Sequence, residues 1–243
     1  MRYAILSDVH SNLEALEAVL AAIGEVDACL CLGDLVGYGP NPNECIERVR
    51  SLPKLTTVVG NHDQAALTGE GLEWFNAHAR AALVWTQEAL AAESRDFLAG
   101  LPETATVDDV TLVHGSLPDP MEYITSPYEA QPTFDMMTTP ICLIGHSHIA
   151  EYYRARANSR LAAQVELFNG GEVEIEPDYC YIINVGGVGQ PRDGNPRAAF
   201  GIYDTDRRLV TVSRVDYPIA DTQAKMQAAG LPWLLIHRLE VGR

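Results

Sequence analysis

Long apolar segments are missing from this sequence of 243 residues. No stretch approaches the roughly 18 consecutive apolar residues that a transmembrane helix needs, which excludes an integral helical membrane protein. The opening residues, Met-Arg-Tyr-Ala-Ile-Leu-Ser-Asp, also lack the apolar core of about 7 residues that a secretory signal contains. We therefore expect a cytoplasmic protein that has no membrane partner.

Positive charge and paired cysteines are scarce as well. Lys and Arg number 17 against 33 Asp and Glu, which gives a formal net charge of −16. Proteins that bind the nucleic-acid backbone depend on clustered Lys and Arg, so nucleic acid is not an expected partner. The 5 cysteines are odd in number and form no C-x-x-C pair. Neither a disulfide framework nor a structural zinc site is therefore expected.

Apolar runs alternate with amphipathic segments over the first 150 residues. The predicted strands are 3–6, 28–32, 57–59, 110–113 and 141–144, and the predicted helices are 13–23 and 42–52. Ser11 and Glu14 match a capping box at the start of the first helix. The last third contains short strands with hairpin spacing, at 152–153, 165–168, 173–175, 181–185, 198–203 and 209–215. This order predicts an α/β sandwich of two sheets with helices outside.

The chain is interpreted as one domain over residues 1–243, because no Pro/Gly-rich linker divides it. One long insertion, at about residues 64–102, interrupts the strand pattern. Its centre, residues 72–98, has the spacing of a helix. This segment, which contains Trp74 and Trp85, is expected to pack in the core, to cover a site or to form a homo-oligomer contact.

Polar groups follow the apolar runs at their carboxyl ends, where ligands bind in open α/β sheets. They are Asp8-Val9-His10, Gly33-Asp34, Gly60-Asn61-His62-Asp63, His114-Gly115 and Gly145-His146-Ser147-His148. Five of the 7 histidines in the chain fall in these groups. Such a concentration of metal-binding residue types indicates a metal site. Taken singly, Asp8, Asp34 and Asn61 would instead be ordinary helix caps.

The set of candidate ligands is large enough for two ions. It comprises Asp8, His10, Asp34, Asn61, His114, His146 and His148. Mixed carboxylate, amide and imidazole ligands favour manganese first, with iron, zinc or nickel as alternatives to it. If Asp34 bridges, each of two ions receives four contacts. Two ions about 3.5–4 Å apart can hold a hydroxide between them and clamp a phosphoryl group for in-line attack.

Together these five motifs resemble the ordered motifs of the calcineurin-like metallophosphoesterases. The similarity to the small bacterial phosphodiesterase-like branch extends to about residue 205. It is carried there by Gly33-Asp34-Leu35-Val36-Gly37-Tyr38-Gly39-Pro40 and Gln190-Pro191-Arg192-Asp193-Gly194-Asn195-Pro196-Arg197. The resemblance implies an αββα sandwich of two mixed sheets with a dinuclear centre at one edge.

The resemblance also implies how the ligands divide. One metal would be held by Asp8, His10, Asp34 and His148, and the other by Asp34, Asn61, His114 and His146. The implied catalytic residues are His62, which would face the scissile bond, and Asp63, which would orient the His62 imidazole and keep it protonated. The expected activity is hydrolysis of a small phosphodiester, or of a phosphomonoester, by metal-bound hydroxide. The alternative is a non-catalytic protein-interaction module on the same fold.

Substrate contacts are assigned to Asn61, Arg192 and Tyr38, with open alternatives. Arg192 and Arg197 could clamp a phosphate as bidentate donors, or could hold their own loop through Asp193. Tyr38 could form a pocket wall or simply pack. Asn12 is expected to cap the first helix rather than to touch a substrate.

Overall fold

The structure is a computed structural model that describes residues 1–156, 159 and 162–243. The strands are β1 (Arg2–Leu6), β2 (Ala28–Cys31), β3 (Thr56–Thr57), β4 (Thr104–Val107), β5 (Val110–Val113), β6 (Ile141–Ile144), β7 (Ala150–Arg156), β8 (Ala163–Glu166), β9 (Gly171–Glu174), β10 (Tyr179–Val185), β11 (Ala198–Asp204) and β12 (Leu209–Val215). The helices are α1 (Leu13–Ile23), α2 (Pro42–Arg50), α3 (Asn61–Thr68), α4 (Ala77–Ala89), α5 (Ala92–Ala99), α6 (Pro127–Met136), α7 (Ile219–Ala228) and α8 (Trp233–His237). Two 3₁₀ turns, η1 (Leu72–Trp74) and η2 (Arg238–Glu240), complete the set.

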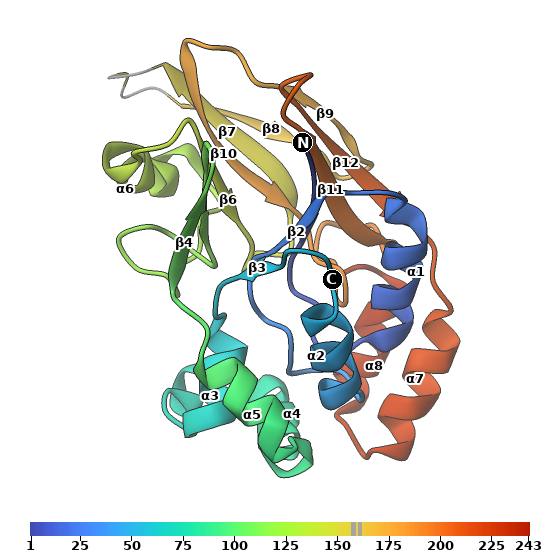
Figure 1. The fold of residues 1–243 in the computed structure, drawn as a ribbon. Coiled ribbons are helices and arrows are strands. Elements are labelled where there is room, and N and C mark those ends of the chain that lie inside the picture. Colours follow the sequence, from blue (N-terminus) through green and yellow to red (C-terminus); the bar gives the residue numbers. More distant parts are fainter. Residues whose placement is uncertain (157–158, 160–161) are drawn as a thin grey trace.

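Two mixed sheets of six strands each form the centre of the molecule (Figure 1). The first sheet has the order β3-β2-β1-β11-β12-β9, and the second has the order β4-β5-β6-β10-β7-β8. Strands β1, β2 and β3 are parallel to one another, as are β5, β6 and β10, and the remaining pairs are antiparallel. The predicted sandwich of two mixed sheets is confirmed.

Strands β1, β2, β5 and β6 are buried on both faces, which explains why they read as continuous apolar runs. Along β1, Tyr3 and Ile5 face the layer between the two sheets, whereas Ala4 and Leu6 pack under the helices. In the second sheet, Cys142 and Ile144 contact α6 through a separate cluster. Figure 1 shows the resulting layers, with α6 outside one sheet and α1 and α7 outside the other.

The segment predicted as one helix over 72–98 is three pieces in the structure: η1, α4 and α5. Asn76 starts a new helix, because its side chain accepts hydrogen bonds from the backbone N–H groups of His78 and Ala79. A second break at Leu90 and Ala91 is fixed by Asn43, which accepts from the Ala91 N–H. The prediction of one continuous helix was wrong because these side chains compete for the backbone.

The first helix begins at the predicted residue, and only one of its two predicted caps forms. Asn12 accepts from the Ala15 N–H at 3.1 Å, so the expected capping role of Asn12 is confirmed. Ser11 lies in a left-handed backbone conformation, and its buried hydroxyl makes no hydrogen bond within the described residues. The capping box of Ser11 and Glu14 is therefore wrong. No helix within the described residues is both long and apolar enough to cross a bilayer.

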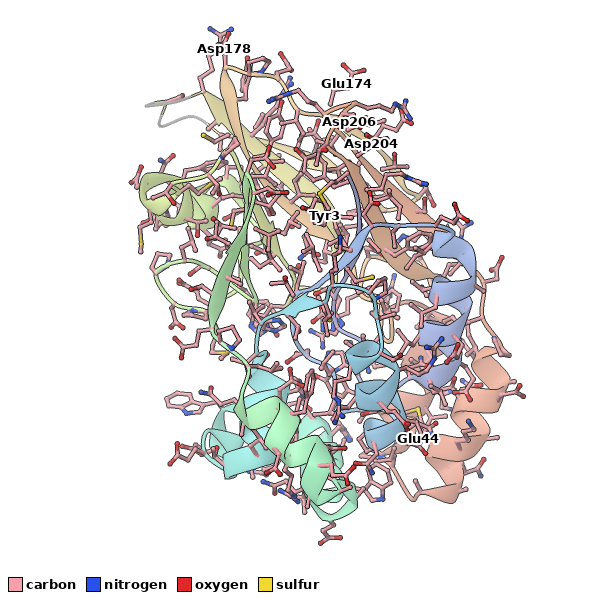
Figure 2. The ribbon with its side chains drawn as sticks, in the orientation of Figure 1. Tyr3, Glu44, Glu174, Asp178, Asp204 and Asp206 are labelled. Carbon is pink, nitrogen blue, oxygen red and sulfur yellow. The ribbon has the colours of Figure 1, made fainter. Side chains whose placement is uncertain are left out.

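Exposed carboxylates gather at the end of the sandwich far from α3, α4 and α5 (Figure 2). Glu174, Asp178 and Asp206 are exposed there, and Asp204 lies beside them. The carboxyl ends of β1 and β2 point the other way, toward the helices (Figure 1). Part of the negative charge of the chain therefore lies on carboxylates that are far from the carboxyl ends of β1 and β2.

Candidate metal centre

Every predicted metal ligand lies just past a strand. Asp8 and His10 follow β1, Asp34 follows β2, and Asn61 is the first residue of α3. In the second sheet, His114 follows β5, and His146 and His148 follow β6. Parallel neighbours end at the same edge of a sheet, so these loops meet where the two sheets abut. All of these side chains are buried except that of Asn61, which is half-buried.

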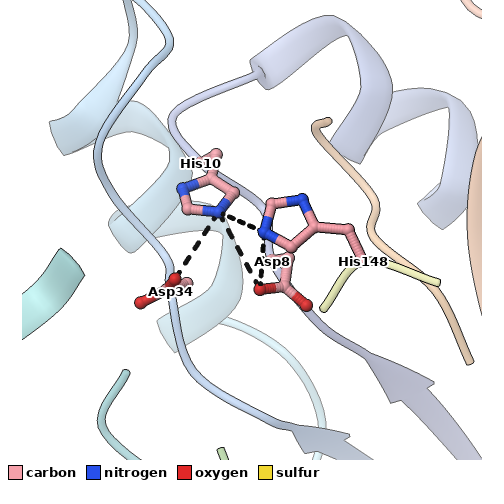
Figure 3. Close-up of side chains that lie close together, drawn as sticks. All are labelled: Asp8, His10, Asp34 and His148. Carbon is pink, nitrogen blue, oxygen red and sulfur yellow. Dashed lines mark hydrogen bonds and ion pairs between the residues drawn. The ribbon is translucent and has the colours of Figure 1, made fainter. Parts of the chain in front are cut away.

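One cluster joins Asp8, His10, Asp34 and His148 (Figure 3). His148 Nε2 lies 3.2 Å from Asp8 Oδ1, and His10 Nε2 lies 3.5 Å from Asp34 Oδ2. His10 Nε2 and His148 Nε2 are only 3.0 Å apart. The four donor atoms lie within 4.8 Å of one another, and none of the four residues is exposed.

A second cluster shares one member with the first. Asp34, His114 and His146 also bring their ligand atoms within 4.8 Å of one another. Asp34 Oδ2, which faces His10, lies 3.3 Å from His114 Nε2. The side-chain oxygen of Asn61 lies 3.2 Å from the same His114 nitrogen. The structure therefore brings all seven predicted ligands into two adjoining groups.

Main-chain carbonyls set the orientation of three imidazoles. His10 Nδ1 lies 2.9 Å from the Val36 oxygen, His114 Nδ1 lies 2.6 Å from the Leu32 oxygen, and His148 Nδ1 lies 2.5 Å from the Gln190 oxygen. A nitrogen that faces a main-chain carbonyl carries a proton, so the neutral form of each ring presents the lone pair of Nε2 to the centre. The lone pairs of His10 and His148 repel each other at 3.0 Å unless both bind a cation.

Several buried atoms of the centre also lack a hydrogen-bond partner within the described residues. Asp8 Oδ1, Asp34 Oδ2 and His146 Nε2 are inaccessible to solvent and make no hydrogen bond within the described residues. The other oxygen of each carboxylate is occupied, since Asp8 Oδ2 accepts from the Ser7 hydroxyl and Asp34 Oδ1 accepts from the main-chain N–H of His62. Buried polar atoms without partners are costly, and a bound cation would satisfy them. The donor set therefore fits divalent metal ions.

The protonation states agree with this fit. Burial lowers the pKa of His10 and His148, and it lowers the pKa of His146 to about 3. Burial would raise the pKa of Asp34, but the imidazoles of His114 and His62 hold it well below its usual range. For His114, burial is outweighed by the Asp34 charge, which raises the pKa to about 9. A divalent ion would thus meet ionised carboxylates and mostly neutral imidazoles, and its binding would displace a proton at His114.

The backbone of the site is unusual in conformation. Asp8, His10, Asp34, His146 and His148 all have positive φ, between 49° and 64°. This left-handed region is uncommon for residues other than glycine, and Asp, Asn and His tolerate it best. Non-glycine residues in such conformations cluster at functional sites. The loops after the strands are therefore bent so that successive ligands turn toward the same centre.

His62 lies beside the first cluster, but Asp63 does not orient it. The two oxygens of Asp63 accept from the N–H groups of Val36 and Gly60, both at 3.1 Å. His62 Nδ1 is buried and makes no hydrogen bond within the described residues. Burial lowers the pKa of His62 to about 4. The expected pairing was wrong because Asp63 occupies position N3 of α3, where it caps the helix.

Packing holds the His62 ring in place. Its centroid lies 4.7 Å from that of His10, 4.4 Å from that of Tyr38 and 4.8 Å from that of Phe75. A Cβ at Gly37 would collide with the imidazole, and Gly37 has a φ of +89°. The glycine in this loop therefore leaves the room that the His62 ring fills.

A cavity of about 660 Å³ opens over the centre. Its lining includes Asn61, His62, His146, Tyr38 and Arg192. Tyr38 is thus a wall of the cavity, and Arg192 donates to the Tyr38 hydroxyl at 3.1 Å.

The loop that carries Arg192 is held by a different arginine. Asp193 forms a buried ion pair with Arg214, and Arg197 Nε donates to Asn195. The alternative in which Arg192 or Arg197 holds the loop through Asp193 was wrong, because β12 supplies the partner.

Tyr123, Arg238 and Phe75 are among the cavity residues that sequence reasoning did not single out. Tyr123 stacks on the His146 ring, with centroids 3.8 Å apart and planes 16° apart. Arg238 is supplied by η2, near the carboxyl end of the chain. Phe75 lies in the segment at 64–102 for which covering a site was one of the expected roles, and Trp74 lines the cavity with it. No spacing rule links Tyr123 or Arg238 to the strand-end motifs, so the sequence contained no signal for those two.

Comparison with known proteins agrees with this geometry. The sequence model of the calcineurin-like phosphoesterase superfamily domain matches residues 1–208. The uncharacterized protein MJ0912 of Methanocaldococcus jannaschii is 38% identical to this chain over an alignment of 248 residues. The alignment covers 99% of this chain and 98% of the relative. The chain therefore belongs to the calcineurin-like phosphoesterase superfamily.

Solved structures show the same fold. The crystal structure of a metallophosphoesterase from Sphaerobacter thermophilus is 46% identical, with a TM-score of 0.90 and coverage of 100% of this chain and 99% of the other. The hypothetical protein PH1004 from Pyrococcus horikoshii is 20% identical, with a TM-score of 0.80 and coverage of 100% and 98%. Family membership and the buried Asp/His clusters together support a metal-dependent phosphoesterase.

Proposed function

We propose that the protein is a dinuclear hydrolase of small phosphodiesters, with phosphomonoesters as a second substrate class. The observation that carries the proposal is the placement of Asp34. Its Oδ2 atom faces His10 Nε2 at 3.5 Å and His114 Nε2 at 3.3 Å, one from each cluster. A carboxylate shared between the two clusters could contact both ions of a two-ion site, which supports the proposal.

Two sets of residues would hold the ions. The first is Asp8, His10, Asp34 and His148, and the second is Asp34, Asn61, His114 and His146. When bound, divalent ions polarise a phosphoryl oxygen and lower the pKa of water to near neutrality. The mixture of carboxylate, amide and imidazole donors supports a borderline metal, and we propose Mn²⁺.

The protein's own groups bind and orient the substrate. His62 and Arg192 line the cavity over the centre, and the Arg192 guanidinium can bind a phosphoryl group through parallel hydrogen bonds. We propose that the His62 imidazole forms a hydrogen bond to the phosphoryl or leaving oxygen, because its Nδ1 has no protein partner within the described residues. Tyr38 holds Arg192 through its hydroxyl.

Metal reconstitution tests the proposal. Metal-stripped protein is assayed on bis(p-nitrophenyl) phosphate and p-nitrophenyl phosphate, with and without Mn²⁺, and bound manganese is counted by mass spectrometry. We expect two ions per chain, turnover only with metal, and a faster rate on the diester. His62→Ala should bind metal normally and lose at least about 100-fold in turnover.

Asp206→Asn is the matched control, because Asp206 is an exposed carboxylate at the far end of the sandwich. It should leave both metal content and turnover unchanged. Binding of one ion per chain with full activity would overturn the dinuclear mechanism. If the protein binds no metal and shows no turnover, the proposal that it is an enzyme is wrong, and the alternative of a protein-interaction module is favoured.

A further inference from the structure

The carboxyl-terminal segment adds a wall to the cavity that the family match does not include. The superfamily model ends at residue 208, whereas Arg238 lies in η2 and lines the cavity. Leu239 anchors this turn, because it is buried in one cluster with Tyr38 and Met226. Arg238 is therefore placed by packing rather than by a flexible tail.

The segment is also attached to the loop that carries Arg192. Gly194 donates its N–H to the Gly242 oxygen at 2.9 Å. Gly242 has a φ of +63°, and a Cβ there would come within 2.6 Å of the Asn195 backbone. This close approach brings η2 and the loop of Arg192 together on the same side of the cavity.

Two guanidinium groups consequently line one cavity without an Asp or Glu partner in the part of the chain that the structure describes. Within the described ranges, no Asp or Glu side chain forms an ion pair with Arg192 or Arg238, although Glu70 and Asp119 line the same cavity. Arg192 donates to Tyr38 and Gln190, and its Nε is buried without a partner. Arg238 Nε donates to the main-chain oxygen of Arg243. Burial and the nearby charge of Arg192 lower the pKa of Arg238.

Two like charges that line one partly buried cavity create a positive potential there, which favours the binding of an anion. The scissile phosphoryl group would be bound at the metal centre below, so it does not account for both arginines. Guanidinium groups bind phosphate oxygens in a bidentate manner, and two of them can hold a second phosphoryl group. The cavity volume of about 660 Å³ leaves room for such a group beside the first.

We infer that Arg238, together with Arg192, binds a second phosphoryl group of the substrate. The preferred substrate is then a small organic phosphate with two neighbouring phosphoryl groups. This inference rests on the proposed function, since it assumes that the metal centre takes the first phosphoryl group. Arg238 acts as a specificity-determining residue, and its contribution comes from outside the part of the chain matched by the superfamily model.

Calorimetric titration of Mn²⁺-loaded protein tests this with two non-hydrolysable probes, methylphosphonate and methylenediphosphonate. The wild type should bind methylenediphosphonate more tightly. Arg238→Gln should weaken methylenediphosphonate binding about 10-fold or more and leave methylphosphonate within about 3-fold, because only the second group loses a charge-assisted bond. Manganese content is measured after each titration to confirm that the diphosphonate has not removed the metal.

Arg207→Gln is the matched control, because Arg207 is an exposed arginine in the turn between β11 and β12. It should bind both probes as the wild type does. Arg238→Lys retains the charge without the fork, so it should lose several-fold in diphosphonate affinity, and it decides the question if Arg238→Gln does not fold. Equal loss for both probes, or no loss for either variant, would overturn the inference.

Failure of this inference is distinguishable from failure of the proposed function. Hydrolysis of bis(p-nitrophenyl) phosphate by the wild type, with unchanged diphosphonate binding in Arg238→Gln, would remove the second-phosphoryl site and leave the hydrolase intact. If the wild type binds Mn²⁺ but hydrolyses no phosphoester, the proposed hydrolase function is wrong. The Arg238-dependent difference between the two probes would still report the anion site.

Discussion

The two sheets contribute different chemistry to the metal centre. The first sheet supplies both carboxylates and the amide, from Asp8, Asp34 and Asn61, with a single imidazole from His10. The second sheet supplies imidazoles only. Oxygen donors that carry charge thus come from one sheet, and neutral nitrogen donors come mainly from the other. Each of the two clusters needs residues from both sheets, so neither sheet could form either site alone.

The largest effect is expected from the residue that belongs to both clusters. Asp34→Asn removes the shared charge, so both ions should be weakened together. Changes to residues that merely support metal ligands cost about 10–100-fold, and a shared ligand should cost at least the upper value in turnover. Manganese content below one ion per chain and near-complete loss of hydrolysis are expected. Retention of two ions would contradict a shared role.

A pair of histidine substitutions separates the two clusters. His10→Ala affects only the first, and His114→Ala affects only the second. Each variant should retain about one ion per chain, and the double variant should retain none. Metal counting and electron paramagnetic resonance of Mn²⁺ can check this, since coupling between two ions disappears when one is lost. Loss of both ions in a single variant would show that the clusters do not fill independently.

Metal removal should weaken the connection between the two sheets. A ligand that binds only the folded state at about 100 times its dissociation constant stabilises by about 2.7 kcal/mol, which corresponds to roughly 5–10 °C in Tm for a chain of this size. Thermal unfolding with and without Mn²⁺ measures this shift. Asp206→Asn should show the same shift as the wild type, and Asp34→Asn should show almost none.

The smallest effect on chemistry is expected at Asp63. Asp63→Asn replaces one of two oxygens that accept from Val36 and Gly60, so it should lower the free energy of unfolding by about 1–3 kcal/mol. Turnover of the folded protein should stay within about 3-fold of the wild type, because neither oxygen contacts His62. A loss of turnover as large as that of His62→Ala would restore the catalytic role first assigned to Asp63.

Strand ends were predictable from the sequence because buried parallel strands are apolar on both faces and stop at polar residues. Strands β5, β6 and β12 have the predicted bounds. Ligand types at the ends of β1, β2, β5 and β6 then identified the metal clusters. Helices α6, α7 and α8 were missed, and their apolar spacing is weak compared with that of α1.

Contacts between distant loops were not predictable in the same way. Asp63 could be an orienting partner or a helix cap, and only the position of the Val36 and Gly60 amides decides between them. Asp193 likewise forms its ion pair with Arg214, which is distant in the sequence but adjacent in the fold. Arg238 enters the cavity through the packing of Leu239 and through Gly242, neither of which has a local pattern that indicates a ligand.

The separation of the ligands along the chain determines when the centre can form. His10 and His148 are 138 positions apart, yet their Nε2 atoms lie 3.0 Å from each other. A growing chain cannot present both nitrogens until the second sheet has been made and has packed on the first. The proposed metal centre would therefore be completed only late in folding, and the folded geometry, rather than the affinity of any short peptide, would select which ion enters.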